Sequence, residues 1–389
     1  MNHIRFYLGI LTVFFSFDCV RNTVEQIEAG TGIEPSLRVY AERCGIGIGV
    51  AINSSSFKES IPQRLKYERI IRQEYNFMSD GFSLSMKHIW KSKDTIDFSP
   101  LDFSATFAQI NNMPMRGFLI WGESVPAWLN SGGYTNEEIE AMTKSYIETV
   151  MKYCKKHFPD VVKYWDAVNE AMETNQDSLP YFQMKKNFWH EKLGPEYVSK
   201  VFRWAHESDS DVLLFYNEYG CEFQTPKKIA TITFLSTLLQ HSVPVHGIGL
   251  QCHFSIDTVR ERMNLSEFAR TIDQFTALGL HVHVTEFDVR INDDCSGLNQ
   301  EKLLKQSQIF KNYFATYVDH CPSPLFTIFG VSDCATWIGS CTPFLPQKKD
   351  WPLPFDDNFL PKPSYDSLLA QLKQRADRFF LTVLRPDFH

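Results

Sequence analysis

WDAVNE at residues 165–170 and VHVTEFD at residues 282–288 are two short β-rich runs that each end in a cluster of polar side chains. In an α/β barrel, the side chains that perform chemistry lie at the carboxyl ends of the parallel strands. We therefore expect both runs to be strands of one barrel. Their polar ends, which carry Glu170 and Glu286, should face a single site.

Six further β-rich runs occur along the chain, and longer amphipathic stretches lie between them. Eight parallel strands are what a closed barrel of this class requires. Helical periodicity is clearest at residues 137–157 and 303–318, where apolar residues recur three or four apart. The sequence therefore predicts a single-domain α/β protein, a (β/α)8 TIM barrel. The expected strands are Gly45–Ile52, Tyr75–Ser79, Met115–Trp121, Val162–Asn169, Val212–Asn217, Gly247–Gln251, His281–Glu286 and Phe326–Val331.

The composition fits one large folded unit. The chain has 389 residues, of which 43% are hydrophobic, and it contains no internal repeat, low-complexity tract or linker to a second module. We expect a signal peptide at 1–20, a leader at 21–40, the barrel at 41–375 and a C-terminal tail at 376–389. The segment Pro352–Leu372 is expected to close the barrel domain.

The N-terminus has the pattern of a secretory signal. Arg5 precedes an apolar run from Phe6 to Phe17, which is too short for a comfortable membrane span. The following Phe17–Val20 lacks a clean small-residue cleavage pattern, so a retained anchor is the alternative. We expect a secreted, extracellular protein with no membrane association after signal removal.

The charge pattern bears on possible partners. The net charge is −7, with no basic stripe and no run of like charges, which disfavours nucleic acid and anionic membranes as partners. A neutral polymer is a better match, and a monomer is expected.

Nine cysteines occur, and loss of Cys19 with the signal would leave eight, an even number that suits oxidising surroundings. Their pairing cannot be read from spacing, although Cys334 and Cys341 are close enough to close one loop.

No CxxC pair or His/Cys cluster with zinc spacing is present, so no metal centre is expected. Asn53 and Asn264 begin glycosylation sequons.

Glu170 and Glu286 together suit the hydrolysis of a glycosidic bond. That reaction needs two carboxyl groups, one to protonate the leaving oxygen and one to attack the sugar or activate water. An isolated glutamate is more often a helix cap or a surface ion-pair partner. Two glutamates that end separate apolar strands of one barrel favour the catalytic interpretation.

The chain resembles glycoside hydrolase family 10, whose best-known members are endo-β-1,4-xylanases. The resemblance covers about residues 40 to 372. The stretches WDAVNEA and HVTEFDV resemble the family's acid/base and nucleophile signatures, and four further blocks occur in the family's order. These stretches are WDAVNEA at 165–171, FYNEYG at 215–220, GIGLQCHF at 247–254, HVTEFDV at 283–289, FGVSDCATW at 329–337 and PKPSYDSLL at 361–369.

The resemblance implies roles for particular residues. Glu170 would be the acid/base and Glu286 the nucleophile of a retaining reaction, with no cofactor. His253 would hydrogen-bond Glu286, with Asp288 behind it fixing the imidazole. Asn169 would hold the sugar 2-hydroxyl. The expected substrate contacts are Lys87, Trp121, Asn217, Tyr219, Gln251 and Trp337.

Three segments depart from the family pattern. Residues 79–88 keep Lys87 but lack the family's Glu-Asn pair, and residues 116–124 are one residue short and lack its sugar-binding histidine and glutamine. Phe329 stands where the family's first eighth-strand tryptophan is usual, whereas Trp337 retains the second. The losses concentrate on the glycone side, which predicts preserved chemistry with altered recognition.

The sequence thus predicts a secreted retaining endo-β-1,4-glycanase of the xylanase type that acts on plant-type β-linked polysaccharide. Two alternatives stay open: a retaining hydrolase of another β-glycan, such as β-glucan or substituted xylan, and a carbohydrate-binding protein without turnover. The presence of both glutamates argues against the second, because a binding module needs neither an acid nor a nucleophile. An extracellular structural protein has no positive feature in the sequence.

Overall fold

Eight parallel strands form a closed barrel in the computed structural model, which describes residues 35–54, 57, 61–173, 183–223, 225–257, 265–338 and 349–384. Neighbouring strands pair in the order β11-β1-β2-β5-β6-β7-β8-β10, and β10 pairs with β11 to close the ring. All of these pairings are parallel. The strands are β1 Gly47–Ala51, β2 Phe77–Ser79, β5 Met115–Trp121, β6 Val162–Asn169, β7 Leu213–Glu218, β8 Gly247–Leu250, β10 His281–Arg290 and β11 Leu325–Ile328.

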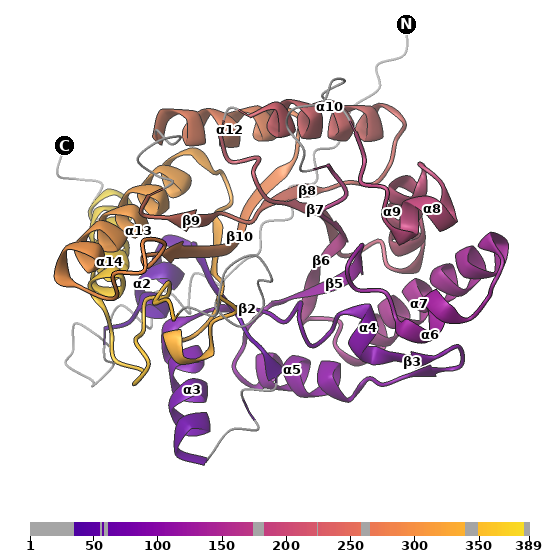
Figure 1. Cartoon of the computed structure of the whole chain (residues 1–389). Coiled ribbons are helices and arrows are strands. Elements are labelled where there is room, and N and C mark those ends of the chain that lie inside the picture. Colours follow the sequence, from indigo (N-terminus) through magenta and orange to yellow (C-terminus); the bar gives the residue numbers. More distant parts are fainter. Residues whose placement is uncertain are drawn as a thin grey trace, which may run out of the picture.

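Helices surround the barrel on its outside (Figure 1). Shorter helices, a 3-10 turn and three additional strands lie in the connections. The helices are α2 Leu37–Cys44, α3 Ile61–Glu74, α4 Met86–Ile89, α5 Ser99–Ile110, α6 Ala127–Ser131, α7 Asn136–His157, α8 Phe188–Leu193, α9 Tyr197–Ser208, α10 Pro226–Gln240, α12 Leu265–Ala277, α13 Gln300–His320 and α14 Pro363–Leu384. The remaining elements are β3 Trp90–Ser92, β4 Thr95–Ile96, β9 His253–Ser255 and the 3-10 turn η2 Asp333–Ala335.

The predicted TIM barrel is confirmed, and each expected strand overlaps an observed one. The main difference in length is at β10, which continues past Glu286 to Arg290. The extension exists because residues 288–290 pair in parallel with β9, a strand that the sequence patterns did not predict. The β3–β4 hairpin was also not predicted.

Local signals explain the two helices that periodicity predicted. Thr135 caps α7 with a capping box: its side chain accepts from the Glu138 N–H, and the Glu138 carboxylate accepts from the Thr135 N–H. Asn299 caps α13 by accepting from the Lys302 N–H. Both helices bury apolar side chains against the barrel, among them Tyr146 of α7.

The expected domain boundaries fall inside helices. Residue 40, the expected end of the leader, lies in α2, and residue 375 lies in α14. The two helices are linked by Glu74, a buried residue at the end of α3, whose Oε2 accepts from the Leu37 N–H at 3.0 Å and from the Tyr365 hydroxyl at 2.9 Å. The expected signal peptide lies outside the described residues, as does the end of the tail.

The barrel interior contains a buried polar group beneath the strand ends. Arg116 of β5 is 2% exposed, and its guanidinium lies 2.6 Å from both Asp166 Oδ1 of β6 and His283 Nδ1 of β10. Burial raises the pKa of Asp166 to about 6 even though Arg116 acts to lower it. Unpaired buried charges are costly, so this contact fixes the three strands relative to one another.

The seven described cysteines are all free thiols, so the expected disulfide framework is absent from this part of the chain. The suggested Cys334–Cys341 pair cannot be followed because Cys341 lies outside the described residues. Burial raises the pKa of Cys221 and Cys252 well above the ordinary value, which keeps these thiols protonated and unreactive.

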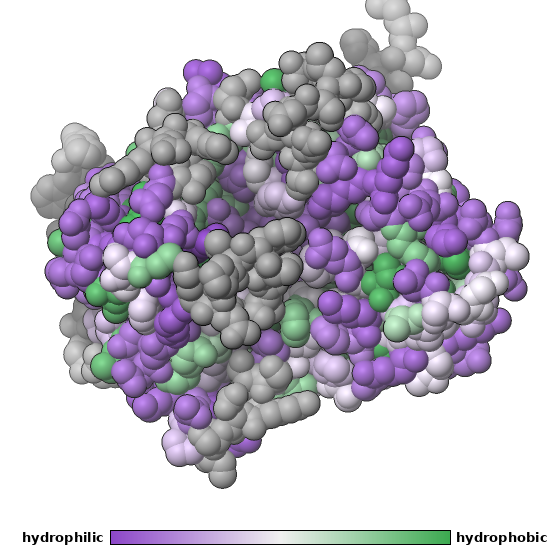
Figure 2. Space-filling view, viewed as in Figure 1, coloured by the Kyte–Doolittle hydropathy of each residue, from purple (hydrophilic) through white to green (hydrophobic). Residues whose placement is uncertain are grey.

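Hydrophilic residues cover much of the face seen in Figure 2, with hydrophobic residues in smaller groups between them. Within the described ranges, no helix combines the length and apolar character that crossing a bilayer requires.

Candidate active site

The register of the barrel brings three predicted site residues and one glycine into a single layer near the carboxyl ends of the strands. Trp121 of β5 pairs with Asn169 of β6, Asn169 pairs with Asn217 of β7, and Asn217 pairs with Gly249 of β8. Because these strands are adjacent in the ring, side chains from this layer converge on one site. Glu170 follows Asn169 directly.

Two buried side-chain amides connect the candidate carboxylates. Asn217 Nδ2 donates to Glu286 Oε1 at 2.7 Å and to Asn169 Oδ1 at 2.8 Å. Gln251 Nε2 donates to Glu170 Oε1 at 2.9 Å and to Asn169 Oδ1 at 3.3 Å. The chain of contacts Glu286–Asn217–Asn169–Gln251–Glu170, called the amide relay below, thus joins the two glutamates through three polar side chains.

The inner members of the relay are enclosed by the barrel. Asn217 and Gln251 are 1% and 2% exposed, so both lie behind the carboxylates rather than at the open surface. Thr285 Oγ1 donates to Asn217 Oδ1 at 2.7 Å, which fixes the orientation of the amide. A Cβ atom on Gly249 would lie 2.2 Å from the same oxygen. Glycine at this position therefore leaves room for Asn217.

Glu170 itself has a strained backbone. Its φ of 55° lies in the left-handed region, which non-glycine residues seldom adopt except where the surroundings enforce it. Its carboxylate Oε2 accepts from Trp121 Nε1 at 3.2 Å and lies 3.6 Å from Lys185 Nζ. Lys87 Nζ is 5.9 Å from the Trp121 ring centre. Trp121 therefore hydrogen-bonds the Glu170 carboxylate directly, and its ring lies close to the Lys87 ammonium.

His253 lies between two carboxylates, with both contacts that the family resemblance implied. Its Nε2 is 3.2 Å from Glu286 Oε2, and its Nδ1 is 3.0 Å from Asp288 Oδ1. Burial opposes a charge on the ring, but the two carboxylates outweigh it and raise the pKa of His253 well above the ordinary 6.5. Because a carboxylate faces each ring nitrogen, the contacts suit an imidazolium that donates from both nitrogens.

The family assignment follows from the match of the whole chain. Residues 36–371 match the family model described as Glycosyl hydrolase family 10. The chain belongs to glycosyl hydrolase family 10. It is a glycoside hydrolase, similar to endo-1,4-β-xylanases. Glu170 directly follows β6, and Glu286 lies within β10.

Curated relatives and solved structures agree on this similarity. The chain is 31% identical to a β-1,4-xylanase of Dictyoglomus thermophilum, with 87% of this chain and 92% of the relative covered. It is similar to the crystal structure of native xylanase 10B from Thermotoga maritima, with a TM-score of 0.79, 31% identity, and coverage of 88% of this chain and 99% of the other. A xylanase 10B from Thermotoga petrophila RKU-1, solved in complex with xylobiose, gives the same TM-score and identity, with 88% and 98% covered.

Trp337 is held at the site by Asp288, the residue that also binds His253. Trp337 Nε1 donates to Asp288 Oδ2 at 2.7 Å, and its ring centre lies 4.9 Å from that of His253. Phe329 stands where the family usually has a tryptophan, and its ring centre lies 5.2 Å from that of His253. The β11 end of this family 10 site is thus aromatic around the imidazolium.

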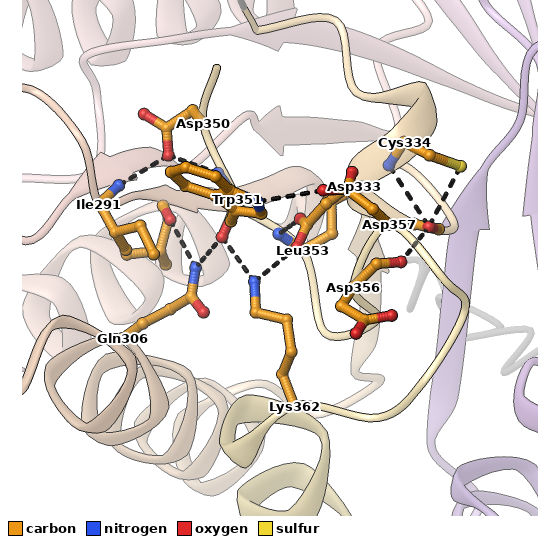
Figure 3. A network of polar contacts seen from close by, with 12 residues as sticks. Ile291, Gln306, Asp333, Cys334, Asp350, Trp351, Leu353, Asp356, Asp357 and Lys362 are labelled. Carbon is orange, nitrogen blue, oxygen red and sulfur yellow. Dashed lines mark hydrogen bonds and ion pairs between the residues drawn. The ribbon is translucent and has the colours of Figure 1, made fainter. Parts of the chain in front are cut away.

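A buried network supports the backbone that leads to Trp337 (Figure 3). Lys362 Nζ contacts Asp333 Oδ2 at 2.8 Å and donates to the Trp351 carbonyl at 2.6 Å. Asp333 Oδ1 accepts from the Leu353 N–H at 2.8 Å. Burial raises the pKa of Asp333 to about 7, although Lys362 acts to lower it. The network ties Asp333 of η2, which lies four residues before Trp337, to the segment that enters α14.

The divergent segment 79–88 uses its polar groups internally. Asp80 is fully buried, and its carboxylate accepts from the Ser104 hydroxyl at 2.6 Å and the Ser83 N–H at 3.0 Å. Ser85 donates to the Phe82 carbonyl at 2.9 Å. Phe82 is 52% exposed. The segment therefore keeps Asp80 inside the protein and exposes the Phe82 ring.

Tyr219 lies between two lysines. Its ring centre is 3.4 Å from Lys227 Nζ and 5.4 Å from Lys185 Nζ. Neither lysine was predicted as a site residue. Lys227 is buried and Lys185 is partly exposed. Lys227 gave no signal because it lies outside the family blocks, and Lys185 follows a polar stretch without a recognisable motif.

Glu218 is another residue that the sequence analysis missed. It lies between Asn217 and Tyr219 in the block FYNEYG, so its position could have marked it as a candidate.

The described part of the chain contains no group of three His, Cys, Asp or Glu side chains arranged to hold a metal ion.

The charge state of His253 can be measured directly. We expect Asp288→Asn to lower the pKa of His253, because one of the two carboxylates that raise it is lost. The imidazolium is present below this pKa and is lost as the pH rises through it, so the variant should lose its charge at a lower pH than the wild type. ¹⁵N NMR titration of histidine-labelled protein measures both transitions.

A matched control is Asp273→Asn, which removes a surface carboxylate that pairs with His320. This control should leave the His253 titration unchanged. A wild-type His253 that titrates at or below pH 6.5 would contradict the assignment.

Proposed function

We propose that the protein is a retaining β-1,4-glycanase of the xylanase type, with Glu286 as nucleophile and Glu170 as acid/base. The observation that carries the proposal is the amide relay, which fixes two carboxylates from separate strands at one site. Two carboxyl groups flanking a glycosidic bond are what such a reaction requires.

In the first step, Glu286 forms a bond to the anomeric carbon as the glycosidic bond breaks, and Glu170 gives its proton to the leaving oxygen. In the second step, Glu170 takes a proton from water, whose oxygen attacks the same carbon and releases Glu286. Each step inverts the anomeric centre, so the product keeps the substrate configuration. The donors Asn217 and His253, one to each Glu286 oxygen, support the negative charge that this residue must carry between turnovers.

Asn169 is suited to bind the sugar next to the cleaved bond. Its Oδ1 accepts from Asn217 and Gln251, which orients the amide. Within the described residues its NH₂ group has no hydrogen-bond acceptor, so it is available to a sugar hydroxyl. A hydrogen bond to the 2-hydroxyl that strengthens in the transition state contributes directly to the rate. We propose that Asn217 and Gln251 act through the carboxylates rather than on the sugar.

The substrate class rests on the relatives, which are named xylanases. A second candidate, a retaining hydrolase of another β-glycan, is favoured by the divergent segment 79–88, called the glycone segment below. There Asp80 is buried and already bonded, and the exposed groups are Phe82 and Lys87. An aromatic ring stacks on a sugar face without reading its hydroxyl pattern, so recognition on this side should differ from that of an ordinary xylanase.

We also propose that the protein is secreted. This rests on the N-terminal sequence, in which Arg5 precedes the apolar run from Phe6 to Phe17.

The two glutamates should differ in their mutant kinetics. Glu286→Ala should abolish turnover while leaving sugar binding largely intact. Glu170→Ala should lower kcat/KM by about 100- to 10,000-fold on substrates with poor leaving groups, because only these need the proton. It should affect activated aryl β-glycosides far less. Steady-state kinetics on a xylo-oligosaccharide and a dinitrophenyl glycoside separate the two effects, and an equal loss for Glu170→Ala on both substrates would contradict the acid/base role.

The glycone segment generates a separate prediction. The protein should show poor apparent affinity for unsubstituted xylotetraose to xylohexaose, because each missing hydrogen bond removes about 0.5 to 1.5 kcal/mol of binding free energy. Steady-state kinetics beside an ordinary family 10 xylanase measure this deficit. Recovery of activity on mixed-linkage glucan or substituted xylan would identify the preferred substrate. Equal efficiency of the two enzymes on xylo-oligosaccharides would refute altered recognition.

A further inference from the structure

Three backbone N–H groups of the turn that carries Glu170 are held by β7. Glu170 has a left-handed φ of 55°, and the two residues after it leave the barrel strand. Three successive backbone N–H groups of this turn donate to acceptors of β7. The contacts are Glu170 N to Asn217 O at 2.9 Å, Ala171 N to Tyr216 Oη at 3.1 Å and Met172 N to Glu218 Oε2 at 3.2 Å.

Glu218 lies at the centre of these contacts. Its side chain is fully buried, and its Oε2 accepts from the Tyr216 hydroxyl as well as from Met172. Through Tyr216, Glu218 thus also supports the contact to Ala171. Its Oε1 lies 2.8 Å from Lys227 Nζ and accepts from the Tyr219 N–H at 3.2 Å.

Lys227 extends the same arrangement to Tyr219. Its side chain is 3% exposed, and its ammonium lies 3.4 Å from the centre of the Tyr219 ring, within cation–π distance. A single buried ion pair therefore contacts both the turn that carries Glu170 and the aromatic residue expected to contact sugar.

Stability alone is a weak reason for such a pair. Burying two charges costs about as much free energy as their attraction returns, and apolar residues of similar volume are often as stabilising. The contacts of this pair are directed at Glu170 and Tyr219, whereas Glu286 is held separately by Asn217 and His253.

We propose that the buried Glu218–Lys227 ion pair is a positioning device for the acid/base group, an inference that rests on the proposed role of Glu170. It holds the strained turn so that the Glu170 carboxyl group meets the leaving oxygen, and it orients Tyr219 beside it. Neither residue touches the reacting atoms. Their loss should impair proton donation and leave attack by Glu286 intact.

The test uses a series of aryl β-glycosides whose leaving groups differ in pKa. Glu218→Gln keeps the size of the side chain but removes its charge, and Lys227→Met keeps much of the buried stem. Each variant should lower kcat/KM by about 100-fold on the poorest leaving groups, the cost of a displacement of about 1 Å. Dinitrophenyl glycosides should be nearly unaffected, so the dependence of rate on leaving-group pKa becomes steeper.

The matched control is Glu74→Gln. Glu74 is also buried and accepts from a backbone N–H and a tyrosine hydroxyl, but it joins α2 to α14 instead of supporting the site. This variant should lower the melting temperature without changing the leaving-group dependence. If Glu218→Gln does not fold, Lys227→Met and the charge-conserving Glu218→Asp carry the test.

The proposal is overturned if the Glu218 and Lys227 variants lose activity equally on all leaving groups, or lose none. Glu170→Ala in the same series separates this inference from the proposed function. A steep dependence for Glu170→Ala with none for the Glu218 and Lys227 variants removes the positioning role alone. No steepening for Glu170→Ala removes the acid/base assignment itself.

Discussion

The amide relay is the constraint on which the active site depends. Asn217 and Gln251 each donate from one nitrogen to Asn169 and to a different glutamate, so the positions of Glu170 and Glu286 are set together. Both donors are almost completely buried, where an amide that lost an acceptor would be costly to leave unpaired. Because the relay joins residues of β6, β7 and β10 and the residue that follows β8, the hydrogen-bond register of the barrel determines the geometry of the carboxylates.

Two groups of buried charged side chains extend the hydrogen-bonded arrangement around the amide relay, in opposite directions around the barrel. On the β9–β11 side, Asp288 holds the His253 imidazolium and the Trp337 indole. On the β7 side, Glu218 and Lys227 support the turn that bears Glu170. The two candidate carboxylates thus rest on the barrel core, whereas most of the divergent segment 79–88 lies in the connection after β2. Connections vary more readily than a barrel core, which is consistent with the proposal that the chemistry is kept while sugar recognition differs.

The sequence predicted the barrel and all eight strands, because strand patterning is a local feature, and the family signatures singled out Glu170 and Glu286 as candidate carboxylates. It did not reveal which way Asn217 and Gln251 point, and it grouped them with the sugar contacts. Their orientation depends on Thr285 and on the space left by Gly249, which come from other strands. Lys185 and Lys227 were missed because they lie outside the family blocks, whereas Glu218 was missed although it lies within one. The cysteine count did not indicate that the seven described thiols are free, because an even number says nothing about their separation in the fold.

The central claim is that the relay fixes Glu286 for attack on the sugar and Glu170 for proton transfer, which requires net retention of configuration. The most direct measurement is ¹H NMR of the anomeric protons during the first minutes of hydrolysis of a soluble β-glycan oligosaccharide that the enzyme cleaves. The account predicts that the β-anomer of the new reducing end forms first and then mutarotates to the equilibrium mixture. Initial release of the α-anomer would show inversion and would contradict the assignment of Glu286 as nucleophile.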